Sequence, residues 1–320
     1  LADKAALIAK PAVPHPTLGD KTPPPAKQSL KDLPLPKTAV PAATKAPSAK
    51  LPDLPKAPPK GMHRADSGIW RCADGEWLVP IDYSVVPKDE IIPGFASTYR
   101  VANMIYSIQL AYNTDQVTTK PEGWADFFDL EKYPGKRAVM DYSVGGIFEI
   151  ALLADGVQPD ELYPLDIDRA IAKLDTIKPS LVFWQSGAQS EELVGSGEVA
   201  MVMTYNARAY DAKVALEMPV DYIFEEQILA AAYLTVPKGS KNVDEAMNLI
   251  AFAVSKPINE TMSADLPLGP SNVNASPNPG MAPDLPSSHL DKPYAVFDDE
   301  WIAANSKMIE SRYQAWKSAQ

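Results

Sequence analysis

The clearest pattern in the chain is a threefold alternation of strand-like and helix-like segments. Apolar runs of strand length cover residues 137–141, 181–184 and 200–204. Each run is followed by a cluster of aromatic, polar and small residues and then by a helix-forming segment. Strands that alternate with helices predict an α/β fold with a mostly parallel sheet. In such a sheet, ligands bind beyond the carboxyl ends of the strands, where these clusters stand.

The spacing of apolar residues predicts the other elements of the folded part. Further strands are expected at 106–113 and 230–236. A last helix starts at Asp298 or Asp299, and the earlier helices are expected at 124–130, 147–154, 166–178, 190–194 and 242–254. Pro257 is expected to end the last of these earlier helices, and residues 257–295, rich in Pro, Asn and Ser, to form a long loop.

Residues 1–60 differ in composition from the rest of the chain. They hold ten Lys against four Asp, 14 of the 32 prolines and no aromatic residue. Such a segment buries too little apolar area to offset the entropy of ordering it. We therefore expect it to be disordered or wrongly assigned to this molecule. The alternative is a basic, proline-rich arm that binds an acidic or SH3-like partner.

Charge and motifs argue against several classes of function. The net charge of −11 disfavours nucleic-acid binding, and no apolar run is long enough to predict a membrane span. The 3 histidines lie in Pro- or Ser-rich surroundings, and no catalytic triad, zinc site, phosphate loop or dinucleotide motif is found. With Cys72 as the single cysteine, no internal disulfide can form. We expect no enzyme activity, no cofactor and no metal.

The candidate binding residues stand at the ends of the predicted strands. Arg208, beyond a strand and near a helix N-terminus, can hold a carboxylate through two parallel hydrogen bonds. Trp184 and Tyr205 occupy matching strand ends, where each is either a pocket wall or a core residue. Ser143 can donate to an anion or cap its own helix. The remaining candidates offer amide, aromatic or acidic groups: Tyr106, Tyr142, Gln185, Gln189, Asn206 and Glu226.

Several motifs follow one another in a specific order between Trp70 and Gln320. They include Leu78-Val79-Pro80-Ile81-Asp82, Trp124-Ala125-Asp126-Phe127-Phe128-Asp129, Trp184-Gln185-Ser186-Gly187-Ala188-Gln189 and Tyr205-Asn206-Ala207-Arg208. In their order and spacing, the chain resembles the spermidine/putrescine-type family of solute-binding proteins that serve ABC importers. The resemblance implies a two-lobed periplasmic binding protein of type II, in which hinge strands join the lobes and the ligand lies between them.

The resemblance also implies a division of the chain. Lobe 1 would comprise residues 61–108 and 231–297, and lobe 2 would comprise residues 109–230 and 298–320. The family normally opens with a strand-helix-strand of lobe 1, where this chain carries its proline-rich segment. Proline removes the hydrogen-bond donors that a central strand needs. We therefore expect the first part of lobe 1 to be missing or altered.

The resemblance carries an expectation about the ligand. Polyamine binders of this family surround the ammonium groups with carboxylates and a tryptophan. At the positions that the resemblance matches to these groups, this chain has Ser143, Gly146, Ala230 and Ala232, while Tyr205 keeps an aromatic face. A polyamine would leave its charges unpaired there, at a cost of several kcal/mol. Members with a similar Tyr-Asn-x-Arg run look like binders of γ-aminobutyrate-like amino acids, so Arg208 and Ser143 are expected to hold an anionic end.

We therefore predict a monomeric periplasmic solute-binding protein that captures a small polar metabolite, either amino-acid-like or an amine/carboxylate compound. It would deliver this ligand to an ABC permease as a peripheral partner of the inner membrane. The alternatives are a polyamine binder of the same transport class and an adaptor protein that uses the basic arm. Because the chain begins with Leu1 rather than Met, we expect a start that is processed, with the signal peptide removed, or truncated or artificial.

Overall fold

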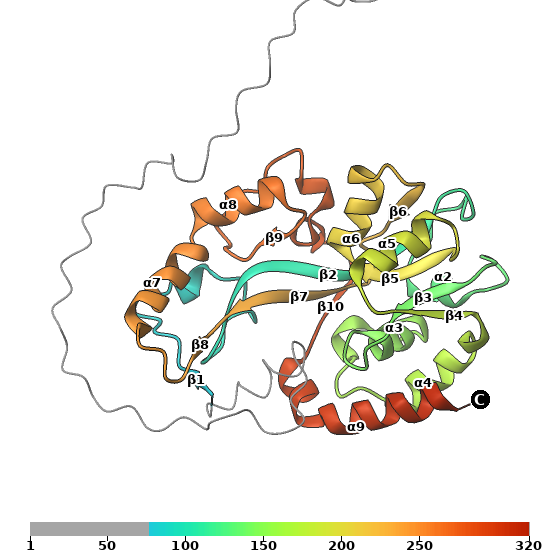
Figure 1. The fold of residues 1–320 in the computed structure, drawn as a ribbon, viewed down its shortest axis with the longest axis horizontal. Coiled ribbons are helices and arrows are strands. Elements are labelled where there is room, and N and C mark those ends of the chain that lie inside the picture. Colours follow the sequence, from blue (N-terminus) through green and yellow to red (C-terminus); the bar gives the residue numbers. More distant parts are fainter. Residues whose placement is uncertain (1–76, 320) are drawn as a thin grey trace, which may run out of the picture. The chain divides into compact units, whose positions relative to one another are not determined.

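The computed structural model describes residues 77–319 (Figure 1). The proline-rich segment 1–60, and with it the prediction of disorder or misassignment, lies outside these residues. The described strands are β1 (Leu78–Val79), β2 (Val101–Asn113), β3 (Arg137–Met140), β4 (Leu181–Trp184), β5 (Met201–Tyr205), β6 (Val220–Tyr222), β7 (Gln227–Leu234), β8 (Val236–Pro237), β9 (Gly269–Pro270) and β10 (Tyr294–Val296). The described helices are α2 (Trp124–Phe128), α3 (Ile147–Ala154), α4 (Ile167–Asp175), α5 (Gly187–Gly195), α6 (Asn206–Tyr210), α7 (Val243–Ala253), α8 (Lys256–Asp265) and α9 (Asp299–Ser318).

The main sheet is mixed rather than mostly parallel. Its strand order is β10-β7-β2-β5-β3-β4, with β6 and β9 also paired to β2. The strands β3, β4 and β5 pair in parallel, as predicted, and so do β7 and β10. However, β2 pairs antiparallel with β5, β6, β7 and β9. The three-unit alternation in the sequence therefore describes one side of the sheet only.

Two clusters of buried apolar side chains lie along β2 and β7. The smaller cluster draws on residues 81–105 and 229–254, and the larger cluster on 108–228 and on residues 295–316. Both strands pass from one cluster to the other, β2 between Ile105 and Ile108 and β7 between Ile228 and Leu229. The division into two lobes stays a prediction, and this change of cluster along two neighbouring strands is the observation that supports it.

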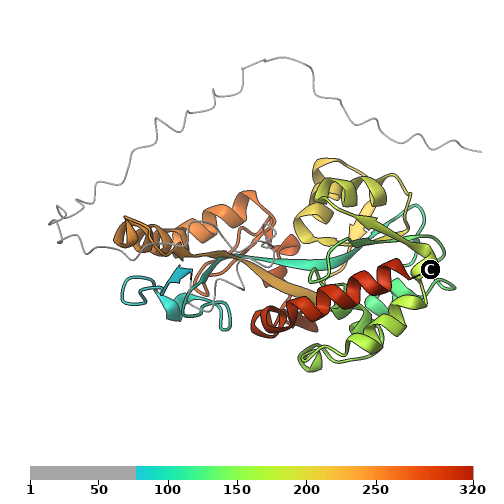
Figure 2. The same cartoon turned by 60° about the horizontal axis from the view of Figure 1, so that its bottom comes forward.

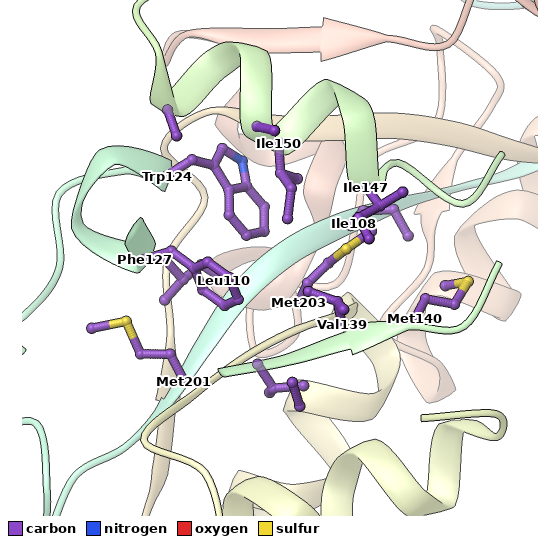
Figure 3. Packing of buried hydrophobic residues seen from close by; sticks show 14 of the residues in the cluster. Ile108, Leu110, Trp124, Phe127, Val139, Met140, Ile147, Ile150, Met201 and Met203 are labelled. Atoms are coloured by element: carbon purple, nitrogen blue, oxygen red, sulfur yellow. The ribbon is translucent and has the colours of Figure 1, made fainter. Parts of the chain in front are cut away.

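The larger cluster packs the helices of the α/β half against the sheet. Figure 3 shows part of this packing, with side chains from α2, α3, β2, β3 and β5: Trp124, Phe127, Ile147, Ile150, Ile108, Leu110, Val139, Met201 and Met203. All of these residues are at most 2% exposed. This dense packing fixes the carboxyl ends of β3, β4 and β5 relative to one another.

The final helix begins where it was predicted and docks on this half of the molecule. Asp298 caps α9 by accepting a hydrogen bond from the Trp301 backbone N–H at 2.9 Å. The side chains that repeat along one face of α9 are buried, namely Ile302, Ile309, Tyr313 and Trp316. The Trp316 indole donates to Asp175 of α4 at 2.8 Å, and Figures 1 and 2 show α9 beside α4.

One helix occupies a region predicted to be loop. α8 spans Lys256–Asp265 and includes Pro257, where the predicted loop was expected to begin. Pro257 lies in the first turn of α8, where the backbone N–H that proline lacks would have no helical partner. The proline therefore does end α7, but it also starts a new helix.

Candidate ligand-binding site

A cavity of about 140 Å³ lies where β2 and β7 change from one cluster to the other. Its wall includes Phe95 and Leu229 of the smaller cluster together with Ile108 and Val144 of the larger cluster. Aromatic rings dominate the lining: Phe95, Tyr106, Tyr142, Tyr205, Tyr233 and Phe297. The other lining residues are aliphatic or small, with one carboxylate: Ile108, Val144, Gly145, Leu229, Ala230, Ala231, Val296 and Asp299.

Strand pairing sets the floor of this pocket. Tyr106 of β2 lies opposite Ala230 of β7, and the small alanine leaves room beside the ring. Tyr205, at the end of β5, meets Tyr106 edge to face, with ring centroids 5.7 Å apart. The buried Trp184 packs against Tyr205 from 6.0 Å and donates its indole N–H to the Met203 carbonyl at 2.9 Å. Trp184 thus positions a pocket residue and is itself outside the lining.

The turn after β3 supplies another part of the wall. Tyr142, Val144 and Gly145 all line the pocket, and the next residue, Gly146, is the N-cap of α3. A Cβ at Gly145 would lie 2.6 Å from the Met140 sulfur, so a larger residue there would have to displace the flexible end of that methionine. Gly146 takes a left-handed conformation, with φ of 102°, at the N-cap of α3. The paired glycines therefore form the turn at the start of α3.

The charge in the pocket wall comes from Asp299, in the first turn of α9. The Arg100 guanidinium lies 2.5 Å from the Asp299 carboxylate, and each of the two side chains is 11% exposed. The same guanidinium lies over the Tyr233 ring, 4.2 Å from its centroid. Burial, together with the nearby Asp299 charge, raises the pKa of the Tyr233 phenol, so that this phenol stays neutral.

Three of the ten predicted site residues line the pocket: Tyr106, Tyr142 and Tyr205. Ser143, next to Tyr142, is buried and donates its hydroxyl hydrogen to Glu310. Asn206 is 1% exposed, accepts from the Ser107 backbone N–H at 3.0 Å and donates to the Pro267 carbonyl. These two polar side chains hold elements together in this structure.

The two predicted glutamines bond to one another and to β3. The Gln185 backbone N–H donates to the Gln189 side-chain oxygen at 2.9 Å. The Gln185 amide donates to Asp141 at 3.1 Å. Neither glutamine lines the pocket, and both are at or next to the start of α5.

The predicted charged residues also have partners of their own. Arg208 on α6 pairs with Glu191 at 2.9 Å and Asp211 at 3.6 Å, and its side chain is 44% exposed. The Glu226 carboxylate accepts from the Trp124 backbone N–H at 2.7 Å. Burial raises the pKa of Glu226. The ligand contacts of Ser143, Trp184, Gln185, Gln189, Asn206, Arg208 and Glu226 stay predictions, and none of these residues is in the pocket lining.

Sequence reasoning missed several lining residues. Tyr233 is the one aromatic residue of the strand predicted at 230–236, and that position could have identified it. Asp299 was interpreted as a helix cap, a role that its neighbour Asp298 has. Phe95 and Phe297 follow no periodic pattern in the sequence, so their placement depends on the folded backbone.

Residues 77–319 contain neither a cluster of metal ligands nor a helix that could span a membrane. In that part of the chain no three His, Cys, Asp or Glu side chains come together as metal ligands. None of the helices described there combines the length and the hydropathy needed to cross a lipid bilayer.

A cavity lined from two clusters joined by neighbouring strands is a candidate site for a small molecule. The fold is that of type II periplasmic binding proteins. The family model for bacterial extracellular solute-binding proteins matches residues 66–287, and the chain belongs to this family. Members of the family are binding proteins rather than enzymes.

Individual relatives carry more specific names. The chain is 31% identical over 237 residues to a γ-aminobutyric acid-binding protein of Pseudomonas aeruginosa, covering 71% of this chain and 66% of that protein. It is 25% identical over 265 residues to spermidine/putrescine-binding periplasmic protein 1 of Haemophilus influenzae, covering 76% and 70%. The chain thus spans just under two thirds of the first of these curated relatives. A solved structure described as a γ-aminobutyric acid (GABA) receptor is similar, with 36% identity, 79% of each chain covered and a TM-score of 0.73.

Proposed function

We propose that this protein captures a small metabolite with an ammonium group in the tyrosine-lined pocket and delivers it to an ABC import permease. The observation that carries the proposal is the combination of four tyrosines and one carboxylate around the cavity. Aromatic faces attract cations, and a desolvated carboxylate forms strong charge-assisted hydrogen bonds with them.

The size of the cavity favours a short ligand. An apolar cavity of roughly 150 Å³ accommodates a molecule of about the size of benzene, and this one measures about 140 Å³. The ligands in the names of the two curated relatives are γ-aminobutyrate, putrescine and spermidine. The first two are short aliphatic chains with a primary ammonium group. We therefore propose a γ-aminobutyrate-like amino acid as the ligand, with a diamine such as putrescine as the alternative.

Arg208 distinguishes these two ligand classes. Its position three residues after Tyr205 supports the proposal that it holds the carboxylate of an amino acid. In this structure the guanidinium is paired with Glu191 and Asp211, so a ligand carboxylate would have to replace them. A diamine has no carboxylate that could pair with Arg208.

The cellular setting is part of the proposal. Membership of an extracellular solute-binding family supports a periplasmic location. There the protein would act as a monomer and approach the outer face of the inner membrane only to meet the permease. Binding by closure of the two halves on a shared ligand would shift the population of a closed state.

The proposal is tested by titrating the full chain with γ-aminobutyrate, putrescine, spermidine and butyrate in a calorimeter. We expect γ-aminobutyrate or putrescine to bind, and butyrate, which has no ammonium group, not to bind. Tyr205→Ala should weaken binding about tenfold, because it removes one aromatic face, worth about 0.5–2 kcal/mol. Arg208→Ala should cost an amino acid about 1.5–3 kcal/mol and a diamine nothing.

Tyr294→Ala is the matched control, since Tyr294 is 36% exposed on β10 and is not part of the lining. The proposal fails if none of the ammonium compounds binds, or if the Tyr205 and Tyr294 variants bind equally well. A putrescine complex that is insensitive to Arg208→Ala would favour the diamine alternative.

A further inference from the structure

An ion pair links the pocket wall to both hydrophobic clusters. Arg100 directly precedes β2, next to Val101 of the smaller cluster, and Asp299 begins α9, which buries Ile302 in the larger cluster. The Arg100 NH1 nitrogen lies 2.5 Å from Asp299 Oδ2, and both side chains are 11% exposed. Charges so far removed from water interact much more strongly than a surface pair.

Arg100 uses the two groups of the pocket best suited to an ammonium ion. Asp299 is the carboxylate of the lining, and the Tyr233 ring, 4.2 Å below the guanidinium, is part of the same wall. Arg100 itself is not among the lining residues. The cation therefore contacts the wall from outside the lining, and it satisfies by charge pairing and cation–π contact the groups that a ligand would need.

An incoming ammonium group must compete with this internal cation. If both cations stay, two positive charges share one desolvated carboxylate. If Arg100 leaves, its own charge must find water or the anionic end of the ligand. In both cases, a more stable Arg100–Asp299 pair means a lower affinity for amines.

We propose that Asp299 and Tyr233 form a cation subsite of the pocket, which Arg100 occupies until the ammonium group of the ligand takes its place. This inference rests on the proposed function, and it assigns to Arg100 the role of an internal competitor that sets affinity. The subsite takes primary ammonium groups. Arg100 and Asp299 stand next to residues of different clusters, so displacement of the pair is also coupled to the relative motion of the two clusters.

The test compares Arg100→Gln, Asp299→Asn and the wild-type full chain in calorimetric titrations with butylamine, putrescine and butyrate. Arg100→Gln removes the competing cation from Asp299 and Tyr233, so the affinity for both amines should rise about tenfold. Asp299→Asn removes the carboxylate and should lower it by about tenfold or more. Butyrate has no cation and should not gain affinity from Arg100→Gln. Arg169→Gln is the matched control, because it removes the same charge from an exposed pair with Asp155, and neither residue lines the pocket.

Opposite effects of the Arg100 and Asp299 variants on amine affinity support the competitor role. Equal losses in both, or no change in either, would show a static wall and overturn it. If Arg100→Gln does not fold, Arg100→Lys replaces it, since lysine keeps the charge but not the planar contact with Tyr233. That variant should show a smaller gain, and an unchanged amine affinity would again overturn the inference. If wild-type protein binds γ-aminobutyrate but the substitutions do not change amine affinity, the proposed function stands and the competitor role is wrong. If no ammonium compound binds wild type or any variant, both the proposed function and the competitor role are wrong.

Discussion

Glu149, in the first turn of α3, is a fully buried acid that the pocket does not use. Its side chain is 1% exposed and accepts one hydrogen bond, from the Tyr163 hydroxyl at 2.7 Å. The second carboxylate oxygen, Oε2, has no hydrogen-bond partner within the described residues. Burial raises the pKa of Glu149, and the Tyr163 hydrogen bond opposes this only in part.

The raised pKa predicts how stability depends on pH. The folded state holds the proton more tightly than the unfolded state, so the contribution of Glu149 is fully present below its unfolded pKa and is lost as pH rises through the folded value. Glu149→Gln cannot ionise and should remove this loss. We expect urea unfolding to show that the variant gains stability relative to wild type between pH 4.5 and pH 8, by about 1–3 kcal/mol. A constant difference between the two proteins across this range would contradict the prediction.

Individual side chains were predictable from the sequence where a strand end fixed them. Tyr205 is the last residue of β5, Tyr142 follows β3, and β-strand periodicity placed Tyr106 on a predicted strand. Arg208 and Asn206 follow the same strand end as Tyr205, but α6 turns them toward Glu191 and Pro267. A rotation of about 100° per helical residue is enough to move a side chain out of a pocket, and the sequence alone does not give the rotation at which α6 begins.

At the level of elements, the start of α3 sets one wall of the pocket. Gly146 is left-handed, with φ of 102°, and a Cβ there would lie 3.1 Å from the terminal carbon of Met203. Gly146→Ala should therefore lower the free energy of unfolding by the left-handed penalty, about 1–2 kcal/mol, plus a further cost for crowding Met203. Denaturant titration measures this loss.

Gly156→Ala separates these two contributions. Gly156, after α3, is also left-handed, with φ of 85°, but a Cβ there would meet nothing within 4 Å. It should show the backbone penalty alone, so the Gly146 variant should be the less stable of the two. A Gly156 variant that is equally or more destabilised would mean that packing at Met203 has no part.

Helices and strands were predicted where one local rule dominated. Asp166 caps α4 as expected, by accepting from the Arg169 backbone N–H, and the Asp155-Gly156 step ends α3. Ser186 was not recognised as a cap, so α5 begins three residues before the predicted helix. α8 was missed because Pro257 both ends one helix and starts the next, and a sequence rule gives these two roles the same signal.

For the whole molecule, the pairing of strands that are far apart in the sequence was the main feature that could not be predicted. The parallel β3, β4 and β5 follow from local alternation with helices. The antiparallel position of β2 between β5 and β7 joins segments that are about a hundred residues apart. It is this arrangement that brings Tyr106 beside Tyr205 and Ala230. The pocket is therefore a property of the topology, and the predicted strand ends supply only a part of its wall.

The proline-rich segment is predicted to contribute nothing to binding, because the pocket is lined by residues from the described part of the chain. The lining runs from Phe95 to Asp299, and all of it lies within the described residues 77–319. Deletion of residues 1–60 should leave the pocket intact, so ligand-induced thermal stabilisation should match that of the full chain within about 1 °C. A basic arm that acts as an adaptor predicts the reverse, because its partner binding would be lost and no small molecule would stabilise either form. Thermal unfolding of both chains with and without γ-aminobutyrate or putrescine separates these outcomes. If the truncated chain folds but is no longer stabilised by a ligand that stabilises the full chain, the binding site extends beyond the pocket described.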